Sequence, residues 1–414
     1  MSGPRRVVVS GMGVISPIGN DTTSYWRNLL CGHSGIGAPT LVTDGRLRPC
    51  VVAEVKGFVP SLHFTDWELS TADRVSQFAL VAAKQAIQRA EIDFTEGLST
   101  RTGTIIGIGV GGQTTHDDSF RRLYLDRAER LHPLTIPRLM VNGPASQVSM
   151  HYGLRGPTFV VASACASATH AIGVAFQMVR SGTIACAVTG GSEACITFGT
   201  LKAWEAMRIM APDTCRPFSI GRRGMVLGEG AAIVVIESLD HARKRGARIL
   251  GEIVGCGMSA DAADIIAPDH EGMVCAMESA LSDGGIAPGE VQYVNAHGTG
   301  TVANDAAETV ANDAAETQAL KRVFGPRARD LAVSSTKSMV GHALGAAGAL
   351  ELVATLMAMR DGIVPPTVGY LGPDPECDLD YVPNVAREMS INTAVSNSFA
   401  FGGLNAVLAV RRVQ

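Results

Sequence analysis

The chain has 414 residues, of which 46% are hydrophobic and 46 are glycine, and it carries a formal net charge of −4. This length suffices for two domains or for one large architecture, and the weakly charged, Gly-rich composition excludes a disordered or fibrous chain. The near-neutral balance argues against nucleic acid as a partner, because nucleic-acid binders normally carry a basic surplus.

Two further features indicate where the protein works. No apolar run is long enough and free enough of breakers to span a bilayer, and the N-terminal apolar residues, broken by Gly13, Pro17 and Gly19, are typical of a strand and loop rather than a signal peptide. The nine cysteines include no C-x-x-C pair, which argues against a disulfide framework or a zinc site. We therefore expect a cytoplasmic enzyme with no membrane contact.

The elements along the chain alternate between apolar strands and helices. Arg6–Val14 predicts a buried strand, Trp67–Ala90 has helical periodicity, and Thr104–Ile108 predicts a strand that leads into the Gly-rich GIGVGG (107–112). Later strands are predicted at Val160–Ala164, Ile184–Thr189, Ala231–Ser238 and Val291–Val294, with a helix over Ala166–Arg180. Strands that alternate with helices indicate an α/β fold.

Two long segments share one plan. VVASACASATHAIGVAFQMVRSG (160–182) and AVSSTKSMVGHALGAAGALELVATLMAMRDG (332–362) each contain a β-branched strand, a Ser-rich turn, an Ala/Gly-rich helix and then Arg-x-Gly. They predict two related halves, residues 1–250 and 251–414, whose small residues let the two helices approach closely. Separate packing of two unrelated domains is the alternative.

The eight residues VANDAAET occur twice in tandem, at 302–309 and 310–317. The repeat is too short and recurs too few times to be a solenoid unit, so it indicates a local duplication. Eight residues at about 100° each would leave the helical face of Leu320, Val323 and Phe324 about 80° out of register. We therefore predict that one copy forms a surface loop.

Cys165 lies directly before the predicted helix that starts at Ala166. At a helix N-terminus, the free backbone N–H groups and the helix dipole favour a thiolate, lower the pKa of a cysteine, and can hold an oxyanion. This setting predicts a nucleophile, and a small apolar core residue is the alternative. Cys186, Cys195 and Cys256 lack the setting and are interpreted as core residues.

Two histidines and a lysine follow predicted strand ends. His297 lies in NAHGTGT (295–301), and Lys337 and His342 lie at the start of the second repeated helix. Together with Cys165 they indicate a catalytic site, whereas His170, on an apolar helix, is interpreted as structural. No spacing of His, Asp and Glu indicates a metal site, and GIGVGG lacks the acidic residue of a dinucleotide-binding fingerprint.

Four motifs in this order resemble those of the β-ketoacyl-acyl-carrier-protein synthases. They are SACAS around Cys165, NAHGTGT around His297, TKSMVGHALGAAGALE around Lys337 and His342, and SNSFAFGGLNA at 396–406. The similarity is to the elongating type II (FabF-like) enzymes and covers essentially the whole chain. Segments 201–219 and 373–388 are most similar to the nodulation-type branch. The resemblance implies the thiolase fold, two related α/β halves stacked in five layers (αβαβα).

The resemblance implies a decarboxylating Claisen condensation in fatty-acid-type chain elongation. Cys165 would take an acyl group from an acyl-carrier protein as a thioester, and the enolate left when malonyl-carrier protein loses carbon dioxide would attack it. His297 and His342 would stabilise that enolate, and Lys337 would orient the site together with a carboxylate partner after HGTGT. The N–H groups of Cys165 and Phe401 would form the oxyanion hole.

The same resemblance implies the substrate contacts. Phe401 matches a gate that moves as the acyl chain enters, and Val110 matches a position that lines the acyl pocket. Phe399, Thr299 and Thr301 are the other residues expected to contact substrate.

The duplication gives two candidates for each acidic residue that the family carries after HGTGT, Asp305 or Asp313 and Glu308 or Glu316. The second copy keeps its distance to the following helix, which must keep its register. Glu316 is therefore the expected site residue.

Members of the family also hold a monovalent cation near the site. Asn295, Glu351, Ser396 and Asn397 match that region, and hydrogen bonding between core loops explains the same residues equally well. The resemblance implies no other cofactor.

Two other functions are weighed against this one. A thiolase-type enzyme would carry a second catalytic cysteine in a C-terminal loop, where this chain has FAFGGLN, and Cys377 lies well before it. A partner subunit similar to a chain-length factor would lack the nucleophile, and Cys165 is present. The octapeptide insertion keeps an inactive or impaired partner subunit open.

The resemblance also implies partners. Family members are homodimers, and the carrier protein that delivers the acyl and malonyl thioesters is acidic. Arg121, Arg122, Lys202 and Arg208 could receive it, or could be ordinary solvated surface residues.

Overall fold

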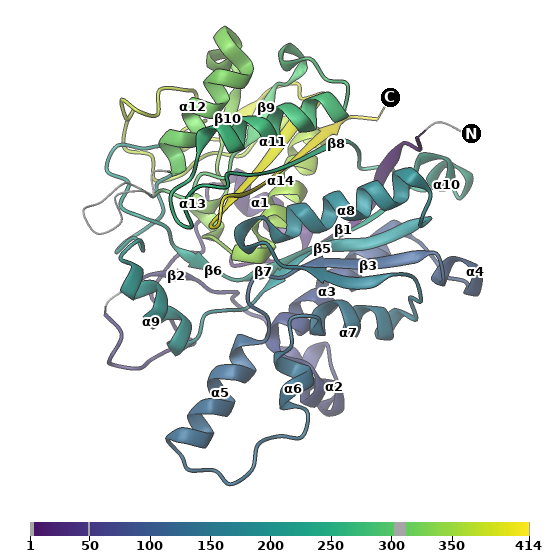
Figure 1. The fold of residues 1–414 in the computed structure, drawn as a ribbon, viewed down its shortest axis with the longest axis vertical. Coiled ribbons are helices and arrows are strands. Elements are labelled where there is room, and N and C mark those ends of the chain that lie inside the picture. The colour runs from purple at the N-terminus through teal and green to yellow at the C-terminus, as the bar shows by residue number, and fades with distance from the viewer. Residues whose placement is uncertain (1–3, 49, 302–311, 414) are drawn as a thin grey trace.

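A mixed sheet of ten strands organises the part of the chain that this computed structural model describes, residues 4–48, 50–301 and 312–413 (Figure 1). The N-terminal strands are β1 (Val7–Ile15), β3 (Thr102–Gly107), β4 (Thr158–Val161), β5 (Cys186–Glu193) and β7 (Gly230–Ser238). The C-terminal strands are β8 (Gly251–Ala260), β9 (Tyr293–Asn295), β10 (Ala332–Ser334), β13 (Thr393–Ala400) and β14 (Leu404–Arg411). Two short pairs form separately, β2 (Val52–Ala53) with β6 (Leu227–Gly228) and β11 (Ile363–Val364) with β12 (Arg387–Glu388).

The two groups of strands have the same topology. The order is β4-β3-β5-β7-β1 in one group and β10-β9-β13-β14-β8 in the other, and a short antiparallel pairing of β1 with β8 joins them. In each group the first three strands are parallel, and the last two pair antiparallel. The two related halves predicted from the sequence are therefore present, while the boundary at residue 250 stays a prediction.

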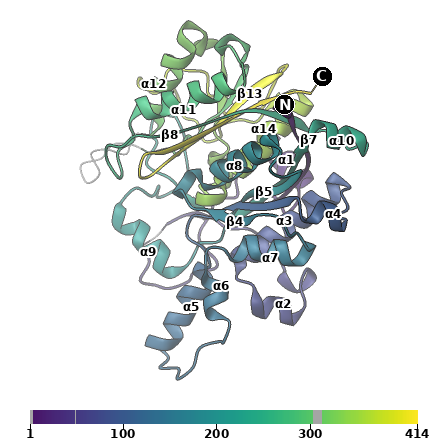
Figure 2. The same ribbon diagram turned by 45° about the vertical axis from the view of Figure 1, so that its right-hand side comes forward.

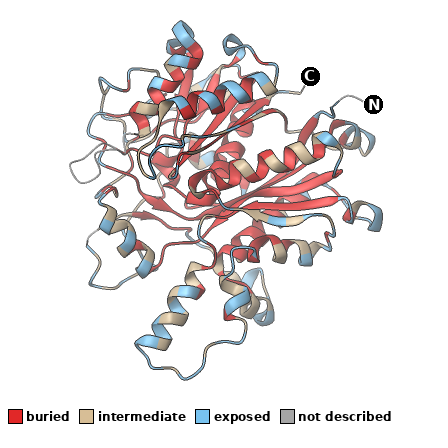
Figure 3. Ribbon diagram, in the orientation of Figure 1, coloured by how far each residue is buried: buried red, intermediate tan, exposed pale blue. Residues whose placement is uncertain are grey.

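Helices complete the five layers that the resemblance implies (Figure 2). α3 (Arg74–Ala90) and α7 (Gly143–Tyr152) pack on the outer face of the N-terminal strands, and α11 (His270–Asp283), with α12 (Asn312–Phe324) beside it, packs on that of the C-terminal strands. α8 (Ser167–Ser181) and α14 (Ala347–Asp361) lie between the two groups. These central helices are largely buried (Figure 3), which matches their Ala/Gly-rich sequences.

The remaining helices are short or peripheral. They are α1 (Thr22–Leu30), α2 (Asp66–Thr71), α4 (Glu96–Ser99), α5 (Gln113–Tyr124), α6 (Thr135–Leu139), α9 (Phe198–Met207), α10 (Leu239–Lys244) and α13 (Lys337–Val340), with 3-10 turns η1 (Pro60–Leu62), η2 (Ala164–Ala166), η3 (Pro288–Glu290), η4 (Gly325–Asp330) and η5 (Leu344–Ala346). Of the helices in the described ranges, none has the length and apolar character needed to cross a bilayer.

The close packing of α8 against α14 depends on a glycine. A Cβ atom added at Gly348 would lie 1.9 Å from Oγ1 of Thr169 and 2.8 Å from Oγ of Ser398. Those two hydroxyls are hydrogen-bonded to each other at 2.7 Å, so they cannot move apart without losing a buried bond.

Replacing Gly348 with valine is therefore expected to lower the free energy of unfolding by about 1–3 kcal/mol, the usual cost of overpacking a core. Urea denaturation measures the change. Gly97→Ala is the matched control, because a Cβ there has no atom within 4 Å and no positive φ opposes it. Equal stability of the two variants would contradict the close approach.

Two predicted elements differ from the structure. The helix predicted over Trp67–Ala90 is interrupted at Ala72, because the Asp73 side chain accepts the Val75 N–H and starts α3 as its N-cap. The strand predicted over Val160–Ala164 ends at Val161, and Cys165 lies in the turn η2 rather than directly before an α-helix.

The second copy of the octapeptide supplies the start of α12, which begins at Asn312. Leu320, Val323 and Phe324 are buried against α11 and neighbouring strands, so this face keeps its register. The first copy lies outside the described residues, and with it the prediction of a surface loop.

Candidate active site

Cys165 lies at the entrance of α8, in the turn η2. The preceding residue, Ala164, has a φ of 48°, a backbone conformation that is uncommon for a residue with a Cβ. The thiol is buried, and the backbone N–H groups of Phe401 and of Cys165 itself donate toward its sulfur. The turn thus directs Sγ at the two N–H groups expected to form an oxyanion hole.

The expected low pKa of Cys165 is wrong for this resting structure. Burial raises the pKa of the thiol to about 12, and the nearby Glu193 adds to this effect. Lys337 and the two N–H groups lower the pKa without overcoming desolvation, because a thiolate loses more hydration in this site than these groups restore. Cys165, the predicted nucleophile, is therefore a neutral thiol before substrate binds.

His297 and His342 lie together, with ring centroids 5.3 Å apart and ring planes at 84°. Burial lowers the pKa of both imidazoles well below its usual value, and the positive charge of Lys337 lowers it further. Both rings are therefore neutral, and each can donate one hydrogen bond. Neither ring nitrogen of His342 has a hydrogen-bond partner within the described ranges, so both are available to a ligand.

Lys337 connects this pair to a buried carboxylate. Its Nζ donates to the carbonyl oxygen of His297 at 2.6 Å, lies 3.3 Å from Nδ1 of the same residue, and pairs with Oε1 of Glu351. The carboxylate partner predicted after HGTGT is therefore wrong. Glu351 comes from α14, one turn into a helix whose other residues near it are apolar.

Glu316 positions the His297 loop instead. Its carboxylate accepts the N–H groups of His297 at 2.9 Å and Gly298 at 2.8 Å, and the Asn397 amide at 3.0 Å. Burial raises the pKa of Glu316 to about 7. Asp313 accepts the next two N–H groups of the loop, each at 3.1 Å. The second copy of the octapeptide thus holds this loop, while Asp305 and Glu308 lie outside the described residues.

The expected substrate contacts are distributed around these groups. The hydroxyls of Thr299 and Thr301 are buried and lie 3.0 Å apart, and Phe399 packs edge-on against His297 at 6.1 Å. Phe401 stacks on Trp204 of α9, with ring centroids 6.0 Å apart. Val110 follows β3 and is 38% exposed.

The residues expected to hold a monovalent cation do not all face one side. Asn295 and Ser396 are register partners on adjacent strands, and the Asn295 amide reaches the carbonyl of Glu351. Within the described residues, Oδ1 of Asn295, Oγ of Ser396, Oε2 of Glu351 and Oδ1 of Asn397 are buried without a hydrogen-bond partner. Asn397 follows Ser396, so its side chain points to the other face of the strand, where it contacts Glu316. Three of the four residues therefore suit a cation.

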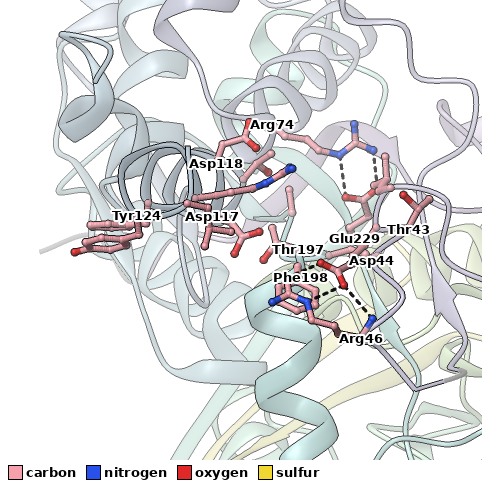
Figure 4. A pocket seen from close by; sticks show the side chains of 18 residues that line it. Thr43, Asp44, Arg46, Arg74, Asp117, Asp118, Tyr124, Thr197, Phe198 and Glu229 are labelled. Atoms are coloured by element: carbon pink, nitrogen blue, oxygen red, sulfur yellow. Dashed lines mark hydrogen bonds and ion pairs between the residues drawn. The ribbon is translucent and has the colours of Figure 1, made fainter. Parts of the chain in front are cut away.

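A cavity of about 690 Å³ opens between α5, the start of α9 and residues 41–46 (Figure 4). Two ion pairs border it, Asp44 with Arg46 and the buried Glu229 with Arg74. Cys165 is not part of its lining, but Ile196, which is, packs in the same hydrophobic cluster as Cys165. The cavity therefore shares one hydrophobic cluster with Cys165.

The predicted docking residues lie on α5 and α9 and directly after α9. Arg121 lines the cavity of Figure 4, and Lys202 pairs with Glu205 at 2.9 Å. Within the described ranges, no cluster of three His, Cys, Asp or Glu side chains could hold a metal ion. A role of these basic residues in docking stays a prediction.

Comparison with known families agrees with this geometry. Residues 4–242 match the N-terminal domain of the β-ketoacyl synthases, and residues 250–371 match their C-terminal domain. The chain belongs to the β-ketoacyl synthase family.

Two characterised relatives of this β-ketoacyl synthase span its length. Nodulation protein E of Rhizobium meliloti (strain 1021) is 48% identical over 410 residues, covering 99% of this chain and 100% of that protein. The 3-oxoacyl-(acyl-carrier-protein) synthase 2 of Staphylococcus aureus (strain COL) is 42% identical over 421 residues, covering 100% of both. A solved structure described as the ishigamide ketosynthase/chain length factor superposes with a TM-score of 0.92 at 33% identity, over 100% of both chains. The type II family and the thiolase fold inferred from the motifs are thus confirmed, and the similarity to the nodulation branch with them.

Sequence reasoning missed three residues of this β-ketoacyl synthase site. Glu351 was considered only for a cation, although a lone charge in the apolar run ALELVATLMAM indicates a buried ion pair. Trp204, which stacks on Phe401, has no neighbouring motif in the sequence that would indicate a place in the site. Glu193 ends an apolar strand, where a buried carboxylate points to a specific set of hydrogen-bond donors.

Proposed function

We propose that this protein is a β-ketoacyl-acyl-carrier-protein synthase that condenses an acyl group held on Cys165 with malonyl-acyl-carrier protein. The observation that carries the proposal is the environment of Cys165. Two backbone N–H groups face its sulfur, and Lys337, whose charge acts on the thiol, contacts His297, which packs against His342. The family is one of condensing acyltransferases, and the chain retains each group that the condensation needs.

Acyl transfer is the first step. The sulfur of Cys165 attacks the thioester carbonyl of the acyl-carrier protein, the bond to the carrier sulfur breaks, and the thiol proton leaves with the carrier as its free thiol. The N–H groups of Cys165 and Phe401 hold the oxyanion that develops on the carbonyl, which stabilises the transition state more than the substrate. They also offset part of the cost of forming a thiolate in this buried site.

Decarboxylation and condensation follow. Loss of carbon dioxide from the malonyl thioester leaves its electron pair as an enolate, whose oxygen accepts hydrogen bonds from His297 and His342. Because Lys337 and burial keep both rings neutral, each ring presents a donor that needs no proton from solution. The enolate carbon then attacks the Cys165 thioester, and cleavage of its C–S bond releases the β-ketoacyl-carrier protein and the Cys165 thiolate, which takes up a proton from water to return to the thiol.

The acyl chain lies toward the cavity of Figure 4 in this proposal. Val110 and Phe399 are proposed to contact the chain along its path, and Phe401 is proposed to leave its stack on Trp204 when the chain enters. A cavity of about 690 Å³ accommodates an extended acyl group. Its mixed charged and aromatic lining does not indicate a particular chain length.

We also propose a homodimer. Exposed apolar side chains gather on and after α5 and α6, among them Leu125 at 64% and Ile136 at 62% exposed. β4 is an edge strand of the sheet, and its Phe159 is partly exposed. An unpaired edge beside apolar side chains is typical of an interface between subunits.

A monovalent cation beside the site is a further part of the proposal. The three unpartnered oxygens of Asn295, Ser396 and Glu351 would bind it, and it would neutralise the buried carboxylate of Glu351 jointly with Lys337. Asn397 is left out of the ligand set, because it contacts Glu316.

Intact-mass spectrometry tests the function. Incubation with an acyl-carrier-protein thioester is expected to add one acyl mass to the protein, and subsequent malonyl-carrier protein is expected to remove it and yield a β-ketoacyl-carrier protein two carbons longer. A folded dimer that acquires no acyl mass from any acyl donor would contradict the proposal and favour a partner subunit.

A further inference from the structure

Glu193, the last residue of β5, is a fully buried carboxylate that the condensation does not use. Its Oε2 accepts the N–H groups of Gly109 at 2.8 Å and Gly345 at 3.1 Å, and its Oε1 accepts that of Val110 at 3.4 Å. Within the described ranges it forms no ion pair. Backbone donors from two separate loops therefore hold this charge.

The two halves of the fold explain why these loops meet there. The turns η2 and η5 both precede a central helix and both begin with a residue of positive φ, Ala164 at 48° and Leu344 at 41°. Gly345 thus occupies the position in the second half that Cys165 occupies in the first. β3 in the first half corresponds in the same way to β9 in the second half. Gly109 lies two residues after the end of β3, and His297 lies two residues after the end of β9, so the two residues occupy equivalent positions.

The place in the fold that is equivalent to the Cys165–His297 site, around Gly345 and Gly109, is therefore filled by packed backbone. A Cβ at Gly109 would lie 2.4 Å from Oε2 of Glu193, and a Cβ at Gly345 would lie 2.2 Å from the nitrogen of Gly109. The two glycines allow the loops to touch, and the carboxylate of Glu193 takes the space that a nucleophile and a histidine fill in the other half.

The hydrogen bond between Glu193 and Gly345 lies close in sequence to His342. His342 is three residues before Gly345, and its backbone is held on the other side by Val226 and Gly228 at 2.7 and 2.9 Å. Leu344, in the uncommon positive-φ conformation, lies between the two anchors. The bond from Gly345 to Glu193 therefore closes the turn that presents the His342 ring.

We propose that Glu193 is a positioning residue for the decarboxylation and condensation step, acting by fixing the turn that carries His342. The proposal rests on the proposed function. The proposal predicts that acylation of Cys165 and decarboxylation respond differently to the loss of Glu193. The turn that holds Cys165 has separate bonds, since Oγ of Ser167 accepts the Ser163 N–H at 2.9 Å and donates to the carbonyl of Ala164 at 2.7 Å. The loop of Phe401 is held by the Gly403 N–H, which donates to the carbonyl of Ala400 at 3.1 Å.

Glu193→Ala and Glu193→Gln test the proposal. Alanine removes all three hydrogen bonds, and malonyl decarboxylation is expected to fall about 10²-fold, the effect of misplacing a catalytic group by about 1 Å. Acylation of Cys165, measured by intact mass over time, is expected to change less than about fivefold. Glutamine keeps an oxygen for Gly109 and Gly345, so decarboxylation is expected to return to within about fivefold of wild type.

Glu237→Ala is the matched control. Glu237 is also a fully buried carboxylate, and it lies at the opposite end of the β5–β7 pair, where it bonds Arg245. Its loss is expected to lower stability while leaving the ratio of decarboxylation to acylation unchanged. A parallel decline of both half-reactions in Glu193→Ala, or no decline, would overturn the proposal.

Hydrogen exchange measures the effect of Glu193 on the two loops independently of catalysis. In Glu193→Ala, amide protection is expected to fall at residues 342–346 and 109–110, and in Glu193→Gln it is expected to persist. A wild-type protein without decarboxylase activity would overturn the proposed function, whereas unchanged protection in Glu193→Ala would overturn the role of Glu193 alone.

Discussion

Replacing Cys165 with alanine is expected to abolish acyl-enzyme formation and to reduce condensation by about four orders of magnitude or more, because no other group can carry the acyl chain. The thiol is buried at the entrance of α8, and alanine fits the same turn. Folding should therefore survive, so intact-mass spectrometry of the variant reports the chemistry alone.

Cys195→Ala provides the control for this experiment, since Cys195 is buried in the same hydrophobic cluster as Cys165 but follows the end of β5. It should acquire the acyl mass as the wild type does.

Because burial raises the pKa of Cys165, alkylation of the wild type by iodoacetamide should accelerate steadily from about pH 7 to about pH 9. A rate that is already constant across this range would show that the thiolate is present at rest.

Replacing Glu351 with leucine is expected to cost about 3–5 kcal/mol of the free energy of unfolding, because it leaves the buried Lys337 ammonium without its carboxylate. Urea denaturation measures this loss. The double variant Lys337→Met with Glu351→Leu should recover much of it, since a buried pair replaced by apolar side chains of similar volume is often neutral. Activity should stay low in both variants, because the positive charge beside His297 is misplaced or missing.

The single variant Lys337→Met should show a pH dependence of the opposite kind from an ordinary ion pair. Burial already raises the pKa of Glu351, and without Lys337 its carboxyl binds the proton more tightly in the folded state than in the unfolded chain. The free energy of unfolding of this variant is therefore highest in acid and should fall as the pH rises above about 4.5, the ordinary glutamate value.

Removing the exposed pair Lys202–Glu205 is the control for these stability measurements, and it should change the free energy of unfolding by only about 0–1 kcal/mol.

Motif order predicted the family and the two-half fold because a strand, a small-residue turn and an Ala/Gly-rich helix leave a local pattern. It also predicted the meeting of His297 with His342 and of His297 with Lys337, which the structure shows. The choice of Glu316 over Glu308 followed from helical register, and Glu316 does bond the His297 loop.

Burial and long-range partners were beyond this reasoning. The pKa of Cys165 was expected to be low from its place at a helix start, but desolvation is set by residues from distant strands. The partner of Lys337 was sought in the nearest acidic motif, whereas the tertiary fold brings Glu351 to it from the next helix. Glu193 could not be assigned at all, because its donors come from loops on both sides of the two-half junction.

The matching strand order of the two halves bears on ancestry as well as on shape. One half contains Cys165 and the other contains His297, His342 and Lys337, so in the proposed mechanism neither unit alone could catalyse the condensation. A duplicated and fused ancestor explains this division of labour: once two copies shared a chain, each was free to lose what the other retained. Gly109 and Gly345, which meet at Glu193, then mark the place where the second copy of the strand-end site has become a packing contact.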